Sequence, residues 1–345
     1  MLKNCASCGG KLNFSPKDRA NVCESCGSVF PVKYDYKFNK KPFEENAETL
    51  EKDTLAESLQ SVKCSSCGAN TMLSKFQAQT VCPYCGNSTI VKQRNKKMLY
   101  IDSIIPFTFN KTDALKKFKA NMTKRFYANK GLFKNLTEKD INGAYVNAFV
   151  FDFNTISDYS GTFSYTTTET DKDGKTTTET HYKNVYGRLD KMFKNITVEA
   201  NSNLTQRELF SIMPFDYVSS VAFRDDFMYG YMLEYQDKMF ADCVKTAEKI
   251  MEKAIKDELL RKYQCDSIVS LSLNIAYSDK KYNYCLLPVY FITRQDKENK
   301  PVKVLMNGQT GKVGKLPASK WKIALTVLLA CIGVVCIALL LALFL

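Results

Sequence analysis

Apolar residues fill the last 23 positions of the chain, Ile323 to Leu345, without a charged side chain among them. As a helix rising about 1.5 Å per residue, this stretch would measure about 34 Å, enough to cross a hydrocarbon core of about 30 Å. Four lysines precede it and none follows it: Lys312, Lys315, Lys320 and Lys322. We therefore expect a single C-terminal transmembrane helix over 323–345 in the cell membrane, with the body on the cytoplasmic side. A buried core helix is the alternative.

Two stretches of the body have the spacing of amphipathic helices. In Lys111–Ala128 the apolar positions expected on the inner side are Leu115, Phe118, Met122, Phe126 and Tyr127. Lys238–Tyr263 carries the longer stripe, formed by Phe240, Cys243, Val244, Ala247, Ile250, Met251, Ala254 and Leu259. Apolar side chains that recur every three or four positions share one helix face, so both stretches are expected to pack on a core.

Strand patterns occupy most of the remaining body. The β-rich segments are Ile104–Phe107, Tyr145–Phe153, Ser160–Thr168, Lys175–Val185, Ile196–Ala200, Ile268–Tyr277, Tyr282–Thr293 and Val302–Met306. A turn at Asp171–Gly174 joins two Thr-rich arms, which predicts a long exposed hairpin. Thr205 and Glu208 have capping-box spacing at the start of a short helix. Together these patterns predict an α+β domain with an antiparallel sheet over residues 100–318.

The N-terminal part contains the same cysteine pattern twice, at an offset of 59 residues. In each copy two Cys-x-x-Cys-Gly turns are separated by fourteen residues, and the cysteines are Cys5, Cys8, Cys23, Cys26, Cys64, Cys67, Cys82 and Cys85. Paired turns with this spacing are typical of zinc ribbons. We expect ribbon 1 over 1–35, a helical linker over 36–62 with its helix at Phe43–Val62, and ribbon 2 over 63–97.

Each ribbon offers four sulfurs to one metal ion. Units this small rarely fold without such a staple, because they contain too few apolar side chains for a core. Two structural Zn²⁺ ions are the main expectation, with rubredoxin-like iron and disulfides as alternatives. Four cysteine ligands leave no open coordination position, so the sites are expected to be structural and not catalytic.

Charge and composition narrow the partner classes. The 345-residue chain has a formal net charge of +13 and a pI near 9.0, which favours an anionic surface such as membrane lipid or nucleic acid. The candidate phosphate contacts are Lys11, Lys17, Arg19, Lys92, Arg94, Lys96 and Lys97. The thirteen cysteines include three without ligand spacing in the body, Cys243, Cys265 and Cys285, which we expect to be core thiols.

The sequence contains few residues or motifs that are typical of catalytic sites. The chain has one histidine, His181, in a hairpin arm, and Gly308–Lys312 lacks the spacing of a phosphate-binding loop. We therefore expect a protein that is not an enzyme, has no catalytic residues and binds no small-molecule substrate.

Four short motifs accompany the ribbons. They are Ile104-Ile105-Pro106-Phe107, Met213-Pro214-Phe215-Asp216-Tyr217, Leu287-Pro288-Val289-Tyr290 and Met306-Asn307-Gly308-Gln309-Thr310-Gly311-Lys312-Val313. With the paired ribbons and the apolar end, this ordered set resembles bacterial membrane-anchored proteins labelled TFIIB-type zinc ribbon-containing. The resemblance covers nearly the whole chain. It implies an association with SPFH-domain and PspA-like phage-shock proteins at stressed membrane.

The leading hypothesis is a non-enzymatic, membrane-tethered zinc-ribbon adaptor that recruits or scaffolds cytosolic proteins, with a role in the envelope stress response. The alternative is a nucleic-acid-binding zinc-ribbon protein tethered to the membrane.

Overall fold

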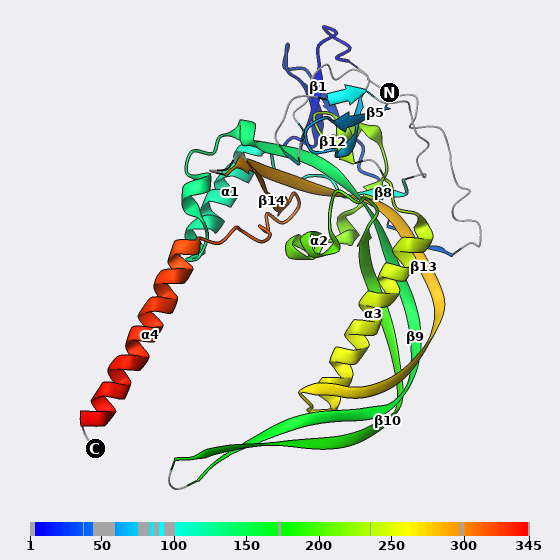
Figure 1. Ribbon diagram of the computed structural model, residues 1–345. Coiled ribbons are helices and arrows are strands. Elements are labelled where there is room, and N and C mark those ends of the chain that lie inside the picture. Colours follow the sequence, from blue (N-terminus) through cyan, green and yellow to red (C-terminus); the bar gives the residue numbers. More distant parts are fainter. Residues whose placement is uncertain are drawn as a thin grey trace.

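The computed structural model describes residues 4–36, 38–43, 59–74, 82, 84–85, 90–92, 101–171, 174–234, 236–296, 298 and 300–343. A curved, largely antiparallel sheet forms an arch, with the N-terminal ribbons near its upper end (Figure 1). Helices pack against this sheet, so the α+β class predicted from the sequence is confirmed.

Three long strands make the arch. They are β9 (Ile141–Thr170), β10 (Thr176–Glu199) and β13 (Ser267–Gln295), with β9 in the middle and antiparallel to both neighbours. The sequence predicted shorter, separate strands, and this was wrong for all three. Tyr145–Phe153 and Ser160–Thr168 are parts of β9, the predicted strands Lys175–Val185 and Ile196–Ala200 fall almost entirely in β10, and Ile268–Tyr277 and Tyr282–Thr293 are parts of β13. A register shift between Ser278 and Lys281 takes up the polar residues that had suggested a break.

Shorter strands complete the sheets. Among the described residues, β11-β8-β13-β9-β12-β6-β5-β7 follow one another in an eleven-stranded sheet, to which β10, β14 and β4 add at the sides. These strands are β4 (Lys41–Pro42), β5 (Leu59–Cys64), β6 (Asn70–Ser74), β7 (Ile90–Lys92), β8 (Ser103–Ile104), β11 (Val221–Ala222), β12 (Met232–Glu234) and β14 (Pro301–Asn307). A separate three-stranded sheet contains β1 (Leu12–Ser15), β2 (Ala20–Cys23) and β3 (Val29–Pro31).

Helix α3 (Phe240–Tyr263) lies along the inner side of the arch (Figure 1). Its buried side chains recur every three or four positions: Phe240, Cys243, Ala247, Met251, Ile255 and Leu259. Phe240 packs edge to face on Phe149 and Tyr282, so the predicted stripe holds the helix on the sheet. Cys243, Cys265 and Cys285 are buried thiols, as predicted.

Two shorter helices, α1 and α2, also belong to the body. Helix α1 (Lys111–Lys124) is capped by Asn110 and buries Ala114, Phe118 and Met122. The prediction that Phe126 and Tyr127 lie on its inner side is wrong: the helix has ended before them, and they are 64% and 48% exposed. Helix α2 (Gln206–Ile212) starts at the predicted capping box of Thr205 and Glu208. Single 3-10 turns occur at Lys130–Phe133, Glu138–Asp140, Tyr217–Ser219 and Asp225–Met228.

The predicted linker helix over Phe43–Val62 falls for the most part outside the described residues. Its last positions are described, and there the prediction is wrong, because Leu59 begins strand β5 and does not continue a helix. Before the gap, Lys41 and Pro42 pair with Tyr282 and Lys281 of β13. The chain therefore reaches the main sheet between the two ribbons.

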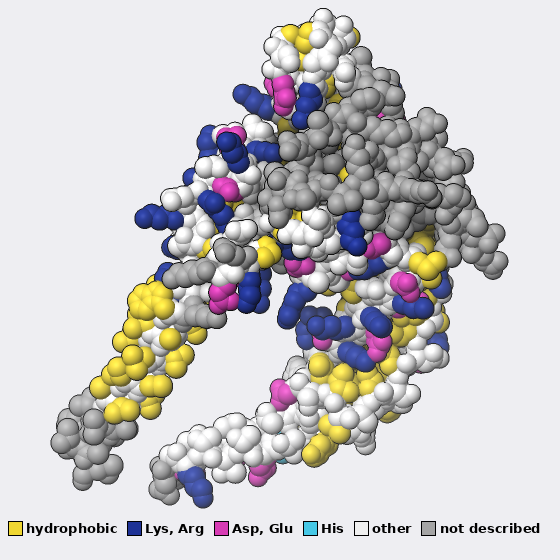
Figure 2. Space-filling view, turned by 45° about the horizontal axis from the view of Figure 1, so that its top comes forward, with side chains coloured by type: hydrophobic (Ala, Val, Ile, Leu, Met, Phe, Trp, Pro, Cys, Tyr) yellow, Lys and Arg dark blue, Asp and Glu magenta, His cyan; other side chains and the backbone are white. Residues whose placement is uncertain are grey.

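Helix α4 (Lys320–Leu343) runs away from the sheet as a separate arm (Figure 1). Its apolar side chains cover the surface of this arm (Figure 2), and those of Val327, Leu328 and Leu329 are more than half exposed. The side chains of α4 are described as far as Ile337, and within the described part of the chain no helix has the length and apolar character needed to cross a membrane. The transmembrane helix expected over 323–345 therefore stays a prediction.

Candidate metal centres

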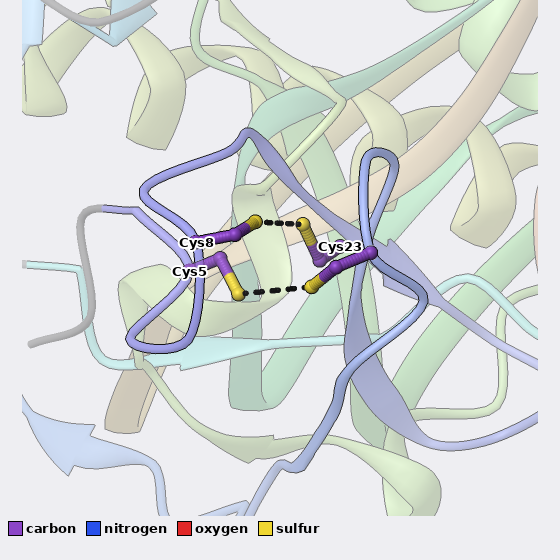
Figure 3. A group of neighbouring side chains, drawn as sticks. Cys5, Cys8 and Cys23 are labelled. Carbon is purple, nitrogen blue, oxygen red and sulfur yellow. Dashed lines mark hydrogen bonds between the residues drawn. The ribbon is translucent and has the colours of Figure 1, made fainter.

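The first cysteine cluster forms where two turns of ribbon 1 face each other. Cys5 and Cys8 precede β1, Cys23 ends β2, and Cys26 lies in the turn that follows. Sulfur atoms from the two turns lie opposite each other, with Cys5 Sγ 3.5 Å from Cys26 Sγ and Cys8 Sγ 3.5 Å from Cys23 Sγ (Figure 3). All four sulfurs lie within 4.8 Å of one another, so the structure brings the four predicted residues together.

The second cluster repeats this arrangement in ribbon 2. Cys64 ends β5, Cys67 lies in the next turn, and Cys82 and Cys85 come from the second turn. Cys64 Sγ is 3.6 Å from Cys85 Sγ, and Cys67 Sγ is 3.7 Å from Cys82 Sγ. The four sulfurs again lie within 4.8 Å of one another.

These distances fit metal ligation and exclude disulfides. Four thiolates at about 2.3 Å from a tetrahedral zinc ion are separated by about 3.8 Å, whereas a disulfide bond is about 2.05 Å long. The observed separations of 3.5 to 3.7 Å match the tetrahedron, and all eight cysteines are free thiols. The disulfide alternative is therefore wrong. The donor set fits one structural ion per cluster, two in all.

Glycine shapes the turns that carry the ligands. Gly9, Gly27 and Gly68 each follow the second cysteine of a turn and have φ between 72° and 76°, a backbone conformation that residues other than glycine rarely adopt. The turn then bends back, and Gly9 N–H donates to Cys5 C=O while Gly68 N–H donates to Cys64 C=O. Main-chain N–H groups of Ser7 and Cys8 also reach the Cys5 sulfur. Such donors stabilise a thiolate.

The two clusters differ in their surroundings. In ribbon 1, hydrogen bonds from the side chain and main chain of Ser28 lower the pKa of the exposed Cys26 thiol to about 6. In ribbon 2, burial raises the pKa of Cys67 to about 11 and that of Cys82 still further. Cys82 and Cys85 are both buried, whereas Cys8 and Cys26 are exposed. Ribbon 2 thus buries three of its four ligands and exposes only Cys67, whereas ribbon 1 has two ligands at the surface.

Ribbon 1 rests on the body through one apolar contact region. The Phe14 ring packs edge to face on Phe227 at 5.3 Å, and Phe14 N–H donates to Tyr229 C=O at 2.9 Å. Tyr34 packs on the same Phe227 ring at 5.1 Å. The Arg19 guanidinium lies 3.8 Å from the centre of the Tyr34 ring and therefore braces this contact. It is engaged within the ribbon, where the sequence had proposed a phosphate contact.

Ribbon 2 is part of the main sheet. Its strand β6 pairs with β12, with Leu233 opposite Met72 and Glu234 opposite Thr71. Tyr84, between the last two cysteine ligands, packs edge to face on Phe291 of β13 at 5.1 Å. Cys64, Cys82 and Cys85 lie in one apolar cluster with body residues such as Val146 and Leu287. The fold of this ribbon and that of the body are therefore coupled.

Sequence reasoning missed two features of this seam. Tyr84 looked like an ordinary spacer, although an aromatic residue between two ligands is a signal that the turn packs on something. Glu234 lies at the seam with 0% exposure, and neither of its carboxylate oxygens has a hydrogen-bond partner among the described residues. Burial raises its pKa to about 8. Nothing in the spacing of the sequence distinguishes it from a surface glutamate.

The four short motifs of the body meet at one place. Asn307 is buried and donates to Ile212 C=O and Pro214 C=O, and Gln309 exchanges hydrogen bonds with the main chain of Asp216. Gly308 N–H donates to Pro288 C=O, and a Cβ at Gly308 would lie 2.4 Å from the Phe107 ring. These contacts give the four motifs a structural role: their residues pack together where β14 meets its neighbours.

The remaining candidates have surface positions or fall outside the described residues. His181 lies on β10, where its Nε2 is 2.8 Å from Thr167 Oγ1. Lys11 and Lys17 are exposed. The side chain of Lys92 and the residues Arg94, Lys96 and Lys97 are not described.

Comparison with known proteins gives a relative along nearly the whole chain. The protein is similar to "Uncharacterized protein YdjG" of Bacillus subtilis (strain 168), with 24% identity over 328 residues that cover 93% of this chain and 91% of the relative. No family model matches the chain. No solved structure matches it.

Proposed function

We propose that the protein is a non-enzymatic adaptor that is held at a membrane by α4 and offers ribbon 1 to a protein partner. The observation that carries this proposal is the contrast between the ribbons. Ribbon 2 is built into the main sheet, while ribbon 1 has its own small sheet and contacts the body through Phe14, Tyr34 and the Asp35 C=O, which accepts from Ala222 N–H. A ribbon with its own sheet and two exposed cysteine ligands is suited to present a surface to a partner.

The metal chemistry supports a structural role. We propose that each cluster holds one Zn²⁺, bound by four thiolates. When bound, the ion fixes two turns relative to each other and supplies folding free energy on the order of 10 kcal/mol. The protein's contribution is to orient the four sulfurs and to donate main-chain N–H groups to them.

Helix α4 supports the membrane part of the proposal. From Ile323 onward its sequence has no charged side chain. Most of the apolar side chains in its described part are exposed and do not pack against the described residues of the body. Lipid is the surface that would cover them, with Trp321 and Lys322 at the boundary. The resemblance noted above makes SPFH-domain and PspA-like proteins the first partners to test.

Affinity purification from detergent tests the adaptor role. We expect the full chain to retain a stoichiometric cytosolic protein, and we expect Ala6→Arg combined with Val29→Arg to lose it, because both side chains are exposed on ribbon 1. Ser66→Arg, exposed on ribbon 2, is the matched control and should retain the partner. Absence of any partner, or equal loss with the control, would contradict the proposal.

Membrane fractionation tests the anchor separately. Two arginines in the middle of α4, at Leu329 and Val334, should release the protein from the membrane fraction because each charge costs about 2.5 to 3.5 kcal/mol in the hydrocarbon core. The same two substitutions at the exposed positions Thr178 and Thr180 of β10 serve as the control. Continued membrane association of the α4 variant would exclude α4 as the anchor.

A further inference from the structure

The lower part of the arch is an arm of three strands. Here β9 lies between β10, paired from Thr176 to Met192, and β13, paired from Ser267 to Ser278. Strands β4, β8 and β14 all join β13 later, from Lys281 onward. In the part of the chain that the structure describes, no strand pairs with the outer side of β10 or of early β13 in this arm. Both are therefore edges whose outer main-chain groups have no strand partner among the described residues.

The two edges differ in charge. The β10 edge carries Glu179, Lys183, Arg188, Asp190 and Lys191 within the paired range. The β13 edge has no charged residue, no proline and no glycine in the twelve positions from Ser267 to Ser278. Natural sheets normally protect their edges with charges, prolines or bulges, because a plain edge pairs with other strands. By this criterion β10 is protected and β13, apart from the bulge at Val269, is not.

The side chains of the β13 edge alternate regularly. Leu271, Leu273, Ile275 and Tyr277 are half-buried and pack toward the core beneath α3, while Ser270, Ser272, Asn274 and Ala276 are exposed on the other face. A further strand beside this edge would satisfy its outer N–H and C=O groups. It would also cover the exposed flanks of the half-buried apolar side chains.

We propose that this edge pairs with the same edge of a second copy of the chain, in antiparallel orientation, to give a dimer with a continuous sheet. A neutral alternating strand is complementary to itself. With the two-fold axis through Leu273, apolar residues lie opposite apolar ones, Leu271 against Ile275, and Ser272 lies opposite Asn274. Within its described residues each copy has one such edge, so the contact closes at two chains. This inference does not depend on metal binding or on the membrane.

Light scattering of the full chain in detergent tests the proposal. We expect a dimer for the protein and a monomer for Ser272→Lys combined with Asn274→Lys. The double substitution places lysine opposite lysine twice by symmetry and should weaken association about tenfold or more. Both positions are exposed, so the fold should tolerate them. The matched control is Tyr182→Lys with Asn184→Lys on the β10 edge, which should remain a dimer.

A charge exchange distinguishes strand pairing from loss of folding. Copies with Ser272→Glu and Asn274→Glu should be monomeric alone and should form mixed dimers with the lysine copies. A photo-crosslinking amino acid at Ser272 should link two chains, whereas one at Asn184 should not. A monomeric full chain at all accessible concentrations, a lysine variant that stays dimeric, or no mixed dimer would overturn the proposal. So would growth beyond two chains, because the neutral β13 edges are then both paired and the remaining β10 edges are protected by charge.

Discussion

The two ribbons have the same ligand spacing and nearly the same sulfur geometry, yet they occupy different places in the fold. Ribbon 1 closes its own three-stranded sheet, and two of its cysteines are exposed. Ribbon 2 shares strand pairing and an apolar cluster with the body. The comparison teaches that a repeated metal motif fixes the local turn but not its role. That role is decided by residues other than the ligands, such as Phe14 and Tyr84.

The largest difference between the ribbons is expected when each loses one cysteine ligand. Cys64→Ser should remove the ion of ribbon 2 and lower the unfolding free energy of the body by several kcal/mol, because metal binding of about 10 kcal/mol is coupled to its sheet. Cys5→Ser removes an equivalent ligand from ribbon 1 and should leave the main unfolding transition in place. Calorimetry of the two variants checks this. Equal destabilisation would contradict the difference between the ribbons.

The seam of ribbon 2 should give the protein a pH dependence through Glu234. Its pKa is about 8 when folded, above its usual value of 4.5, so the folded state binds more protons and stability falls as pH rises from about 4.5 to 8. Denaturant unfolding measured from pH 6.5 to 9, a range in which the thiolates keep their metal, should show the part of this fall that lies between pH 6.5 and about 8. The loss is up to a few kcal/mol. Glu234→Gln should flatten the profile, and an unchanged slope would contradict the assignment.

The contact of ribbon 1 can be removed without touching a ligand. Phe14→Ala should cost about 3 kcal/mol, the usual loss for a buried phenylalanine, and the cost should fall on docking of the ribbon. Hydrogen exchange should then increase at β11 and Asp225–Met228 while the two metal ions stay bound. Loss of the ribbon 1 ion would show instead that Phe14 belongs to the core of the ribbon.

A smaller effect is expected at Tyr84. Its ring is buried against Phe291, but its hydroxyl has no hydrogen-bond partner among the described residues. Tyr84→Phe keeps the ring and removes the unpaired group, so it should stabilise ribbon 2 by about 1 kcal/mol. Thermal unfolding checks the sign. Destabilisation would mean that the hydroxyl has a partner.

Local patterns predicted much of this molecule. The cysteine spacing identified all eight clustered sulfurs, and apolar periodicity located α1 and α3, because both signals depend on neighbours in the sequence. The unbroken length of β9 and β13 could not be predicted, because a bulge at Ser278–Lys281 looks like a turn until the partner strand is known. The attachment of ribbon 2 through β12 was also hidden, since strand order depends on contacts between distant segments.

Metal content of the full chain tests the central claim most directly. Mass spectrometry under native conditions, with elemental analysis of the same sample, should give two zinc ions per unaltered chain. The Cys5→Ser variant and the Cys64→Ser variant should each retain one zinc ion. If iron were found in place of zinc, the identity of the metal would be wrong, but the two four-cysteine sites would stand. A chain without metal, or a ligand substitution that leaves both ions bound, would contradict two independent four-cysteine centres.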